Sequence, residues 1–179
     1  MPPTTGGEIP RGLDDLKVYV LAADVPGTAV DVPAAQALEW SVESDSDELR
    51  GDNAAIALVR NPKTVSGTIR VARINLPAFA AMTGGTVATS GTGTEEISTQ
   101  EETSAAPAQY FQIVGQAASA DVNGSAYRVT IYKALVTGGP NESLTIDEWS
   151  TPEFEFEAVA NSSGNLLKRQ NYETAIAIS

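Results

Sequence analysis

The sequence predicts a mainly β fold, a β-sandwich with one short flanking α-helix. Runs that alternate apolar and polar residues recur along the 179-residue chain, separated by clusters of Gly, Pro, Asn and Asp. The strictest run, Glu153 to Glu157, places two phenylalanines on one face of a strand and three carboxylates on the other. Only the segment 76–82 shows helical spacing. These observations favour a sheet that packs over a core, with a single helix beside it.

The predicted strands follow this alternation and are bounded by turn residues. In chain order they span residues 16–23, 34–43, 54–60, 64–74, 108–117, 127–137 and 153–160. The third and fourth are expected to pair as a hairpin, because Asn61-Pro62-Lys63 confines a proline to the turn between them. The fifth and sixth are expected to pair through Asn123-Gly124, which is a strong hairpin signal.

The predicted helix begins at Leu76 and ends at Met82. These two residues and Phe79 fall on one helical stripe, and Gly84-Gly85 supplies the stop. Pro77 suits the first turn, where a missing N–H costs no helical hydrogen bond. We expect this helix to cover an end or an edge of the sheet.

The chain is predicted to be one domain with extensions at both ends. Residues 16–162 form the body, with an N-terminal extended arm at 1–15 and a C-terminal arm or strand at 163–179. Both extensions have little apolar content, so we expect neighbouring subunits alone to order residues 1–15 and the tail beyond Gly164. Within the body, residues 85–107 are expected to form a long polar loop without structure of its own.

Composition excludes several kinds of site. The chain contains no Cys and no His, which removes disulfides, thiolate metal sites, the common zinc ligands and the Ser-His and Cys-His dyads. Its formal net charge of −12 argues against direct gripping of DNA phosphates. The N-terminus lacks the basic and apolar regions of a secretion signal, and no window is apolar enough for a membrane span. We therefore expect a protein that is not an enzyme and that uses no metal or cofactor.

The sequence twice places spaced carboxylates on the outer face of a strand. Glu153, Glu155 and Glu157 form one set, and Glu39 and Glu43 form the other. No attractive partner is visible for either set, whereas an ordinary solvated sheet face usually mixes charge signs. These faces therefore indicate a deliberately anionic surface. The alternative is an acidic sheet without a specific role.

A second group of acids lies on the polar stretch 44–53, which we expect to be a loop. Its charged members are Asp45, Asp47, Glu48, Arg50 and Asp52. Hard cations prefer several carboxylate oxygens, but the EF-hand pattern fails because Leu49 and Arg50 occupy a ligand position and the glycine position. Arg50-Gly51-Asp52 also spells a tripeptide read by adhesion receptors, which we interpret as chance.

Several segments are more informative as an ordered set than singly. They are residues 16–23, Asp31-Val32-Pro33, 48–52, 76–85, the strand with Phe111 and Gly115-Gln116, Tyr132-Lys133-Ala134, and Phe154-Glu155-Phe156. Together they cover about residues 13–160. This set resembles the major tail tube protein of long-tailed, non-contractile bacteriophages of the siphophage type, especially those that infect actinobacteria. Unlike some members of that family, the chain is expected to lack an appended immunoglobulin-like domain after the body.

The resemblance implies a structural virion protein that self-assembles. Proteins of that family are β-sandwiches that form six-fold rings, and the rings stack into a tube through which the genome leaves the capsid. Strands of neighbouring subunits would then join in a closed inter-subunit β-barrel. The protein would be located in the virion tail, and in the host cytoplasm during assembly. Its implied partners are further copies of itself, the tape measure protein, and the tail terminator or tip proteins, while double-stranded DNA passes without specific binding.

The resemblance also suggests roles for the two acidic groups. Glu39, Glu43, Glu153, Glu155 and Glu157 are candidates to face the lumen. The members of the 44–53 stretch that are candidates for ring stacking are Asp45, Asp47, Glu48, Arg50 and Asp52. Two other classes stay open at this point, namely a decorating or adhesive β-sandwich domain on a virion or cell surface, and a carboxylate-based hydrolase marked by a glutamate of raised pKa.

Overall fold

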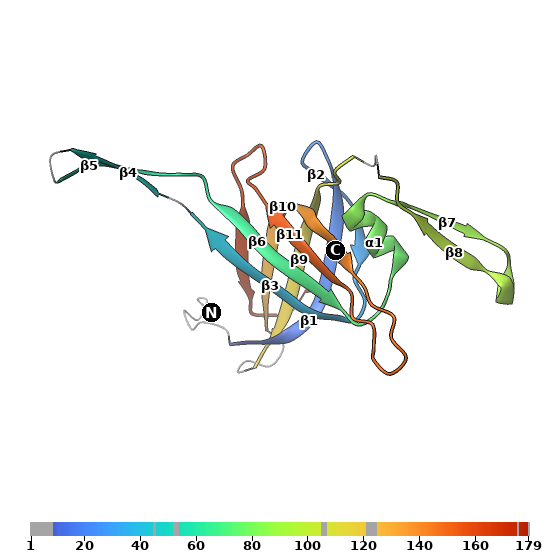
Figure 1. Cartoon of the computed structure of the whole chain (residues 1–179). Helices are drawn as coiled ribbons and strands as arrows, with labels where there is room; N and C mark the ends of the chain where they lie inside the picture. Colours follow the sequence, from blue (N-terminus) through green and yellow to red (C-terminus); the bar gives the residue numbers. More distant parts are fainter. Residues whose placement is uncertain are drawn as a thin grey trace.

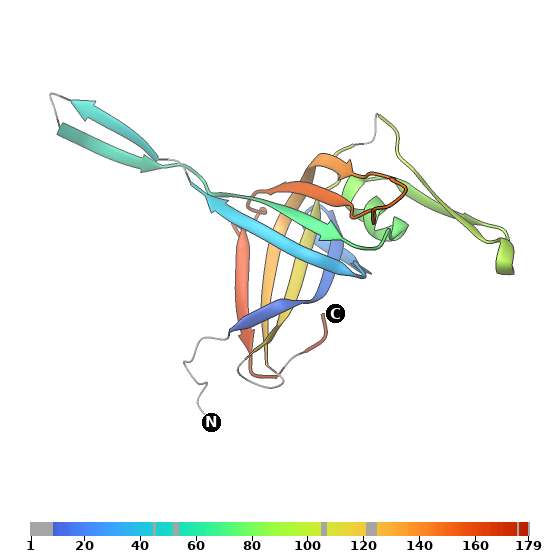
Figure 2. The ribbon, with the colours of Figure 1, turned by 60° about the horizontal axis from the view of Figure 1, so that its bottom comes forward.

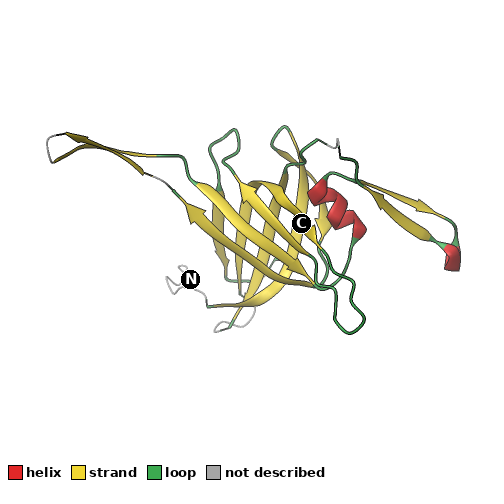
Figure 3. Ribbon diagram, viewed as in Figure 1, coloured by secondary structure: helices red, strands yellow, loops and turns green. Residues whose placement is uncertain are grey.

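The computed structural model describes residues 9–44, 46–51, 54–104, 107–120, 125–174 and 176–178. In these ranges the chain is mainly β, with antiparallel strands and one α-helix (Figure 3). The strands are β1 (Pro10–Ala22), β2 (Val25–Asp31), β3 (Ala35–Glu43), β4 (Ser46–Gly51), β5 (Ala54–Arg60), β6 (Thr64–Val71), β7 (Thr86–Ser90), β8 (Ile97–Glu101), β9 (Phe111–Ser119), β10 (Ala126–Asn141), β11 (Glu153–Ala158) and β12 (Leu167–Tyr172). The helix α1 spans Leu76–Thr83, and a 3-10 turn, η1, spans Gly93–Glu95.

Eight strands form one sheet in the order β2-β1-β9-β10-β11-β6-β3, with β12 paired to β10 beside this path. The long strand β10 joins two parts of the sheet, because residues 126–131 pair with β9 and β12 while residues 134–141 pair with β11. The sheet bends along β10, so that β3, β6 and β11 cross over β1 and β9 (Figure 2). Among the described strands the sheet does not close on itself, and β2 and β3 are the ends of the path.

The core lies between the two parts of the sheet. β1 and β9 contribute Leu16, Val18 and Ile113, which pack in one cluster with Phe154 and Phe156 of β11. The predicted alternation in 153–157 is confirmed, since both phenylalanines are buried and Glu155 and Glu157 are exposed. Burial of each phenylalanine contributes about 2 kcal/mol, which holds β11 over the core.

The predicted helix is confirmed, with its start at Leu76 and its stop at Gly84, although its last residue is Thr83 and not Met82. The side chain of Asn75 accepts a hydrogen bond from the backbone N–H of Ala78 at 3.1 Å and caps the start of α1. Gly84 ends the helix in the left-handed conformation, with φ 87°, and donates its N–H to the carbonyl of Ala80. Phe79 packs edge-on against Phe154 with ring centroids 4.7 Å apart, so the helix covers the β11 end of the core.

The hairpin expected between residues 54–60 and 64–74 is wrong. β5 pairs with β4, while β6 pairs with β3 and β11. β3 continues into β4 and β5 into β6, so the four strands form one long ribbon whose outer half projects from the body (Figure 1). Pro62 lies at the joint of this ribbon, where ladder pairing is interrupted, and not in a hairpin turn.

The long polar loop expected at 85–107 is also wrong for most of its length. β7 and β8 pair from Thr86 to Glu101 as a second projecting hairpin, on the opposite side of the body from β4 and β5 (Figure 1). Thr and Ser favour strands when they pair across a ladder, as the hydroxyls of Thr89 and Ser98 do at 3.5 Å. Nearly all side chains of both strands are exposed, so no apolar alternation marks them in the sequence.

Both chain ends are more tightly attached than expected. The strand expected from Leu16 begins at Pro10, which pairs with Ser119 of β9. The tail forms β12 against β10, and Ile178 is only 3 % exposed. The prediction that neighbours alone order the tail beyond Gly164 is therefore wrong for residues 167–172 and 176–178. The first eight residues lie outside the described part of the chain.

Candidate functional site

The candidate lumen-facing acids lie on one face of the sheet. In the register of β11, β6 and β3, Thr68 lies between Glu155 and Glu39, and Ser66 lies between Glu157 and Ser41. Residues paired directly in an antiparallel ladder point to the same side. The same register pairs Glu153 with Arg70 and Glu43 with Thr64, so all the predicted acids share this side. We call it the acidic face, formed by Glu39, Ser41, Glu43, Thr64, Ser66, Thr68, Arg70, Glu153, Glu155 and Glu157.

Strand packing sets the spacing of the acids across this face. Glu39 and Glu155 flank Thr68 on either side, so their backbones are about 10 Å apart, or two strand spacings. Two unit charges at that distance in water repel by about 0.4 kcal/mol, and salt at about 0.1 M screens them further. The sheet can therefore hold this row of acids without a cation beside each one.

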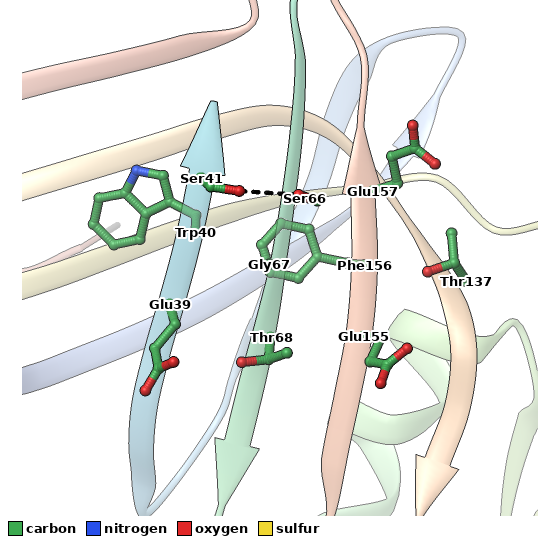
Figure 4. Close-up of a pocket in the computed structure, with 10 residues that line it drawn as sticks. All are labelled: Glu39, Trp40, Ser41, Ser66, Gly67, Thr68, Thr137, Glu155, Phe156 and Glu157. Carbon is green, nitrogen blue, oxygen red and sulfur yellow. Dashed lines mark hydrogen bonds between the residues drawn. The ribbon is translucent and has the colours of Figure 1, made fainter. Parts of the chain in front are cut away.

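A shallow groove of about 540 Å³ runs over the centre of the acidic face (Figure 4). Glu39, Thr68 and Glu155 lie side by side on neighbouring strands along it, and the hydroxyls of Ser41 and Ser66 are 3.1 Å apart. The groove lining combines carboxylates and hydroxyls, which water solvates well, with Trp40, Gly67 and Phe156.

Gly67 allows the strands under this groove to pack closely. A Cβ built at this position would lie 2.2 Å from the carbonyl oxygen of Glu39 and 2.7 Å from Cζ of Phe156. The ring of Phe156 lies across the backbone of β6 at Gly67 (Figure 4). A side chain at Gly67 would therefore displace β3 or Phe156, and with them the acids they carry.

One acid of the face has a cation as its partner, which the sequence did not indicate. Arg70 donates from Nε and Nη2 to Oε2 of Glu153 at 2.9 and 2.7 Å. The hydrogen bond and the charge of Glu153 raise the pKa of the Arg70 guanidinium above its ordinary value. Both side chains are partly exposed, at 42 % and 29 %, so solvent screens the pair and it adds little to stability.

Arg70 could have been placed on this face from the sequence, but its partner could not. Thr64, Ser66, Thr68 and Arg70 alternate along β6, and this spacing alone puts them on one side of the strand. Which strand lies beside β6 is a long-range choice. The incorrect hairpin of residues 54–74 hid the neighbours β3 and β11, and hence the pair with Glu153.

The acidic face is suited to repulsion and hydration more than to proton transfer. Glu155 and Glu157 are both exposed on one strand and share one environment, whereas an acid and a base need environments that separate their pKa values. Glu43 accepts a hydrogen bond from Ser66 at 3.1 Å, an exposed contact of the same kind. In the part of the chain that the structure describes, no three His, Cys, Asp or Glu side chains are grouped to hold a metal ion.

The candidate ring-stacking residues belong to the other end of the same ribbon. Asp47, Glu48 and Arg50 lie in β4, so the predicted loop is largely a strand. Asp45 and Asp52 lie outside the described residues. β4 follows β3 directly after the end of the acidic face, which puts these positions on the projecting half of the ribbon (Figure 1).

Comparisons with known proteins leave the site to be interpreted from its own geometry. No protein-family model matches the chain, and no curated protein matches it. None of the helices in the described ranges has the length and apolar character needed to cross a bilayer.

Proposed function

We propose that this chain is the tail tube subunit of a long, non-contractile bacteriophage tail. Copies of the chain form six-fold rings, and the rings stack into a tube that conducts the genome into the host. The observation that carries the proposal is that two separately predicted sets of glutamates, five residues in all, lie on one face of β3, β6 and β11. In this role the chain is a structural protein and not an enzyme.

An acidic lining suits a channel for DNA. Duplex DNA carries one negative charge per about 1.7 Å of its axis, and proteins that hold it do so with Lys and Arg. A wall that carries Glu39, Glu155 and Glu157 in every copy repels the phosphates and keeps a layer of water and counterions between wall and DNA. DNA then slides without specific contacts, driven by the pressure stored in the capsid.

The open edges of the sheet support assembly. β2 and β3 end the strand path, so each has one side without a partner strand among the described residues. Exposed edges of this kind pair readily with another chain. We propose that each copy acts as a β-sandwich whose edge strands join those of its neighbours into a closed barrel around the lumen.

The projecting hairpins support contact between rings. The β4–β5 ribbon and the β7–β8 hairpin extend from opposite sides of the body (Figure 1). We assign ring stacking to the ribbon that contains Asp47, Glu48 and Arg50, with the β7–β8 hairpin at a ring interface or on the outer wall. The tape measure protein and the terminator or tip proteins would contact the tube lumen and ends.

Negative-stain electron microscopy of the purified chain tests this function directly. Rings or tubes of uniform diameter, with a central channel, are the expected result. A chain that stays monomeric by light scattering at high concentration would contradict the proposal. That outcome would favour the decorating or adhesive domain instead.

A further inference from the structure

The loop between β10 and β11 exposes an unusual amount of apolar surface. Leu144, Ile146 and Trp149 are 90 %, 100 % and 94 % exposed. Single exposed apolar residues are common on protein surfaces, but three large ones within six positions of one loop mark a contact surface. We call residues 142–152 the apolar loop, which extends beyond the ends of β10 and β11 below α1 in Figure 1.

The chain also has an apolar groove, which none of the residues of the apolar loop line. It has a volume of about 310 Å³ and lies between β3, at one end of the sheet, and the strands β1, β9 and β10. Its apolar lining includes Leu13, Leu38, Trp40, Tyr127 and Val129. We call it the sheet-end groove. Its volume is at the lower end of the range, roughly 300 to 1,000 Å³, in which pockets hold small ligands.

A glycine keeps this groove open. A Cβ at Gly115 would lie 2.8 Å from Cδ2 of Leu38, which would push Leu38 away from β9 or close the space between them. Leu38 and Trp40 are only partly buried, although both pack against the core cluster. The groove is therefore an uncovered continuation of the core, at the place where the sheet fails to close.

We infer that the apolar loop of one copy binds in the sheet-end groove of a second copy, with Trp149 as its anchor. Each copy then has one donor surface and one acceptor surface, in different places. Such a heterologous contact, repeated head to tail, closes into a ring or continues as a filament. This inference rests on the proposed function and deepens it by naming the contact between subunits.

The area of the two surfaces fits a specific interface. An aromatic side chain buries roughly 150 to 250 Å², and Leu144 and Ile146 add to it, so the loop offers about 500 Å². Trp149 would fill the groove, and Leu144 and Ile146 would cover the surface around it. Contact with the groove and its rim brings the total toward about 1,000 Å², the lower limit for a specific protein interface. Tryptophan is the residue most often found as the anchor of such an interface.

Cysteine cross-linking tests the contact, because the chain contains no cysteine of its own. Single variants I146C, on the loop, and Q36C, on the groove rim, are mixed, assembled and treated with a short bismaleimide. We expect a covalent dimer from the mixture and none from either variant alone. The matched control replaces I146C with I176C, at an exposed apolar position of the tail away from both edge strands, and should give no dimer with Q36C.

The strength of the contact is tested by sedimentation velocity with W149S and I176S. We expect W149S to weaken self-association by on the order of tenfold or more, as loss of an interface anchor does, and I176S to leave it unchanged. Both side chains are exposed, so both variants should unfold at the wild-type temperature. Equal association of W149S and the wild type would overturn the inference.

The remaining outcomes separate this contact from the proposed function. A double variant I146C/Q36C that cross-links only within single chains would overturn the inference, since the loop would then fill its own groove. Tubes that form while the mixed variants give no dimer would also overturn it, but would leave the tail tube function in place. A wild-type chain that never associates would overturn both.

Discussion

The two parts of the sheet have outer faces of opposite character. The acidic face, over β3, β6 and β11, is open to solvent and has Arg70 as its one ion-paired cation among the described residues. The other outer face, over β1, β9 and the first part of β10, is crossed by the tail. There Lys17 donates from Nζ to the carbonyl of Ile178 at 2.7 Å, and Arg128 donates to the carbonyl of Ile176.

On the tail-covered face, the polar and apolar side chains that meet the tail have their partners within the same chain. Arg128 donates to Oε1 of Gln116 from Nε at 3.1 Å and from Nη2 at 2.7 Å, and it lies 4.6 Å from the centre of the Tyr172 ring. Ile178 packs with Tyr19 in a small second cluster, and burial raises the pKa of Tyr19.

The comparison indicates which face is available to line a channel. Cations and a hydrophobic anchor on one face hold the chain's own tail. On the other face, Glu43 and Glu153 contact only Ser66 and Arg70 of the same sheet, and no other described segment covers the glutamates. A surface that its own tail already covers is less accessible to DNA or to another partner. Under the proposed function, the acidic face is therefore the one that we propose lines the lumen, and four predictions test the contrast.

The largest expected effect comes from filling the backbone gap under the acidic face with G67A. The new Cβ would meet the carbonyl oxygen of Glu39 and the ring of Phe156, so strands must separate or Phe156 must move. We expect a loss of about 3 kcal/mol in the free energy of unfolding, measured with urea. G139A is the matched control, because a Cβ there meets nothing within 4 Å. It should change stability by less than about 0.5 kcal/mol, and an equal loss in both variants would contradict the role of Gly67.

The next effect concerns the anchor of the tail on the opposite face. Ile178 is buried, so I178A should lower the free energy of unfolding by about 2 kcal/mol. Ile176 is exposed and uses only its backbone carbonyl, so I176A should stay within about 0.5 kcal/mol of the wild type. Thermal unfolding of both variants measures the difference. Equal melting temperatures for I178A and the wild type would mean that the Ile178 side chain does not hold the tail on the sheet.

The parts of this structure that could be predicted from sequence are the local ones. Phe154 and Phe156 alternate with acids within one strand, and Asn75, Pro77 and Gly84 mark the ends of α1 within a few residues. The acidic sets could be named because period two alone decides which side chains share a face. Their convergence on one face could not be foreseen, because it depends on the long-range pairing of β6 with both β3 and β11.

The errors came from strands and ends that lack an apolar pattern. The β7–β8 hairpin is polar on both sides, so composition suggested a loop where cross-strand pairs form a ladder. Pro62 suggested a turn, but it occupies a break in a ladder, where a missing N–H is equally harmless. The tail looked too polar to fold alone, yet one buried residue, Ile178, and two cations hold it on the sheet.

A smaller effect, dependent on pH, is expected where the β1–β2 turn contacts the body. Asp24 forms an ion pair with Lys133 at 2.7 Å and accepts a hydrogen bond from the N–H of Ser162 at 2.8 Å. The hydrogen bond from Lys133, followed by that from Ser162, lowers the pKa of Asp24 below its ordinary value. A lowered pKa in the folded state adds stability that is present above the ordinary pKa of Asp, about 3.9, and is lost as pH falls through the folded value.

The D24N variant measures this contribution. Between about pH 4 and pH 2 the wild type should lose more stability on acidification than D24N, because only the wild type protonates this carboxylate there. Urea unfolding at several pH values gives the two curves. Parallel curves across this range would show that Asp24 does not couple folding to pH.

Reversing the charge of three glutamates on the acidic face should have the smallest effect on folding and the most specific effect on function. In E39K/E155K/E157K the side chains are exposed and their mutual repulsion is screened, so stability should change by less than about 1 kcal/mol and tubes should still form. Ring repetition would turn each lysine into a circle of positive charge around the DNA. Since each phosphate contact adds a salt-dependent attraction, DNA should adhere to the wall during passage.

Genome ejection from particles that carry this variant measures the adhesion, with tube formation as the first check. Ejection should be slowed, and raised salt should partly restore it because salt weakens phosphate contacts. The matched control E95K/E96K/E173K makes the same change in net charge at exposed positions outside the acidic face. Because Glu95 and Glu96 lie between β7 and β8, its tubes are verified first, and particles with normal tubes should eject normally. Normal ejection by E39K/E155K/E157K would reject an electrostatic role for these glutamates in the lumen and leave them as solvated groups of an acidic sheet. If both variants slowed ejection equally, net charge would be responsible, and the contrast between the two faces would have no bearing on the path of the DNA.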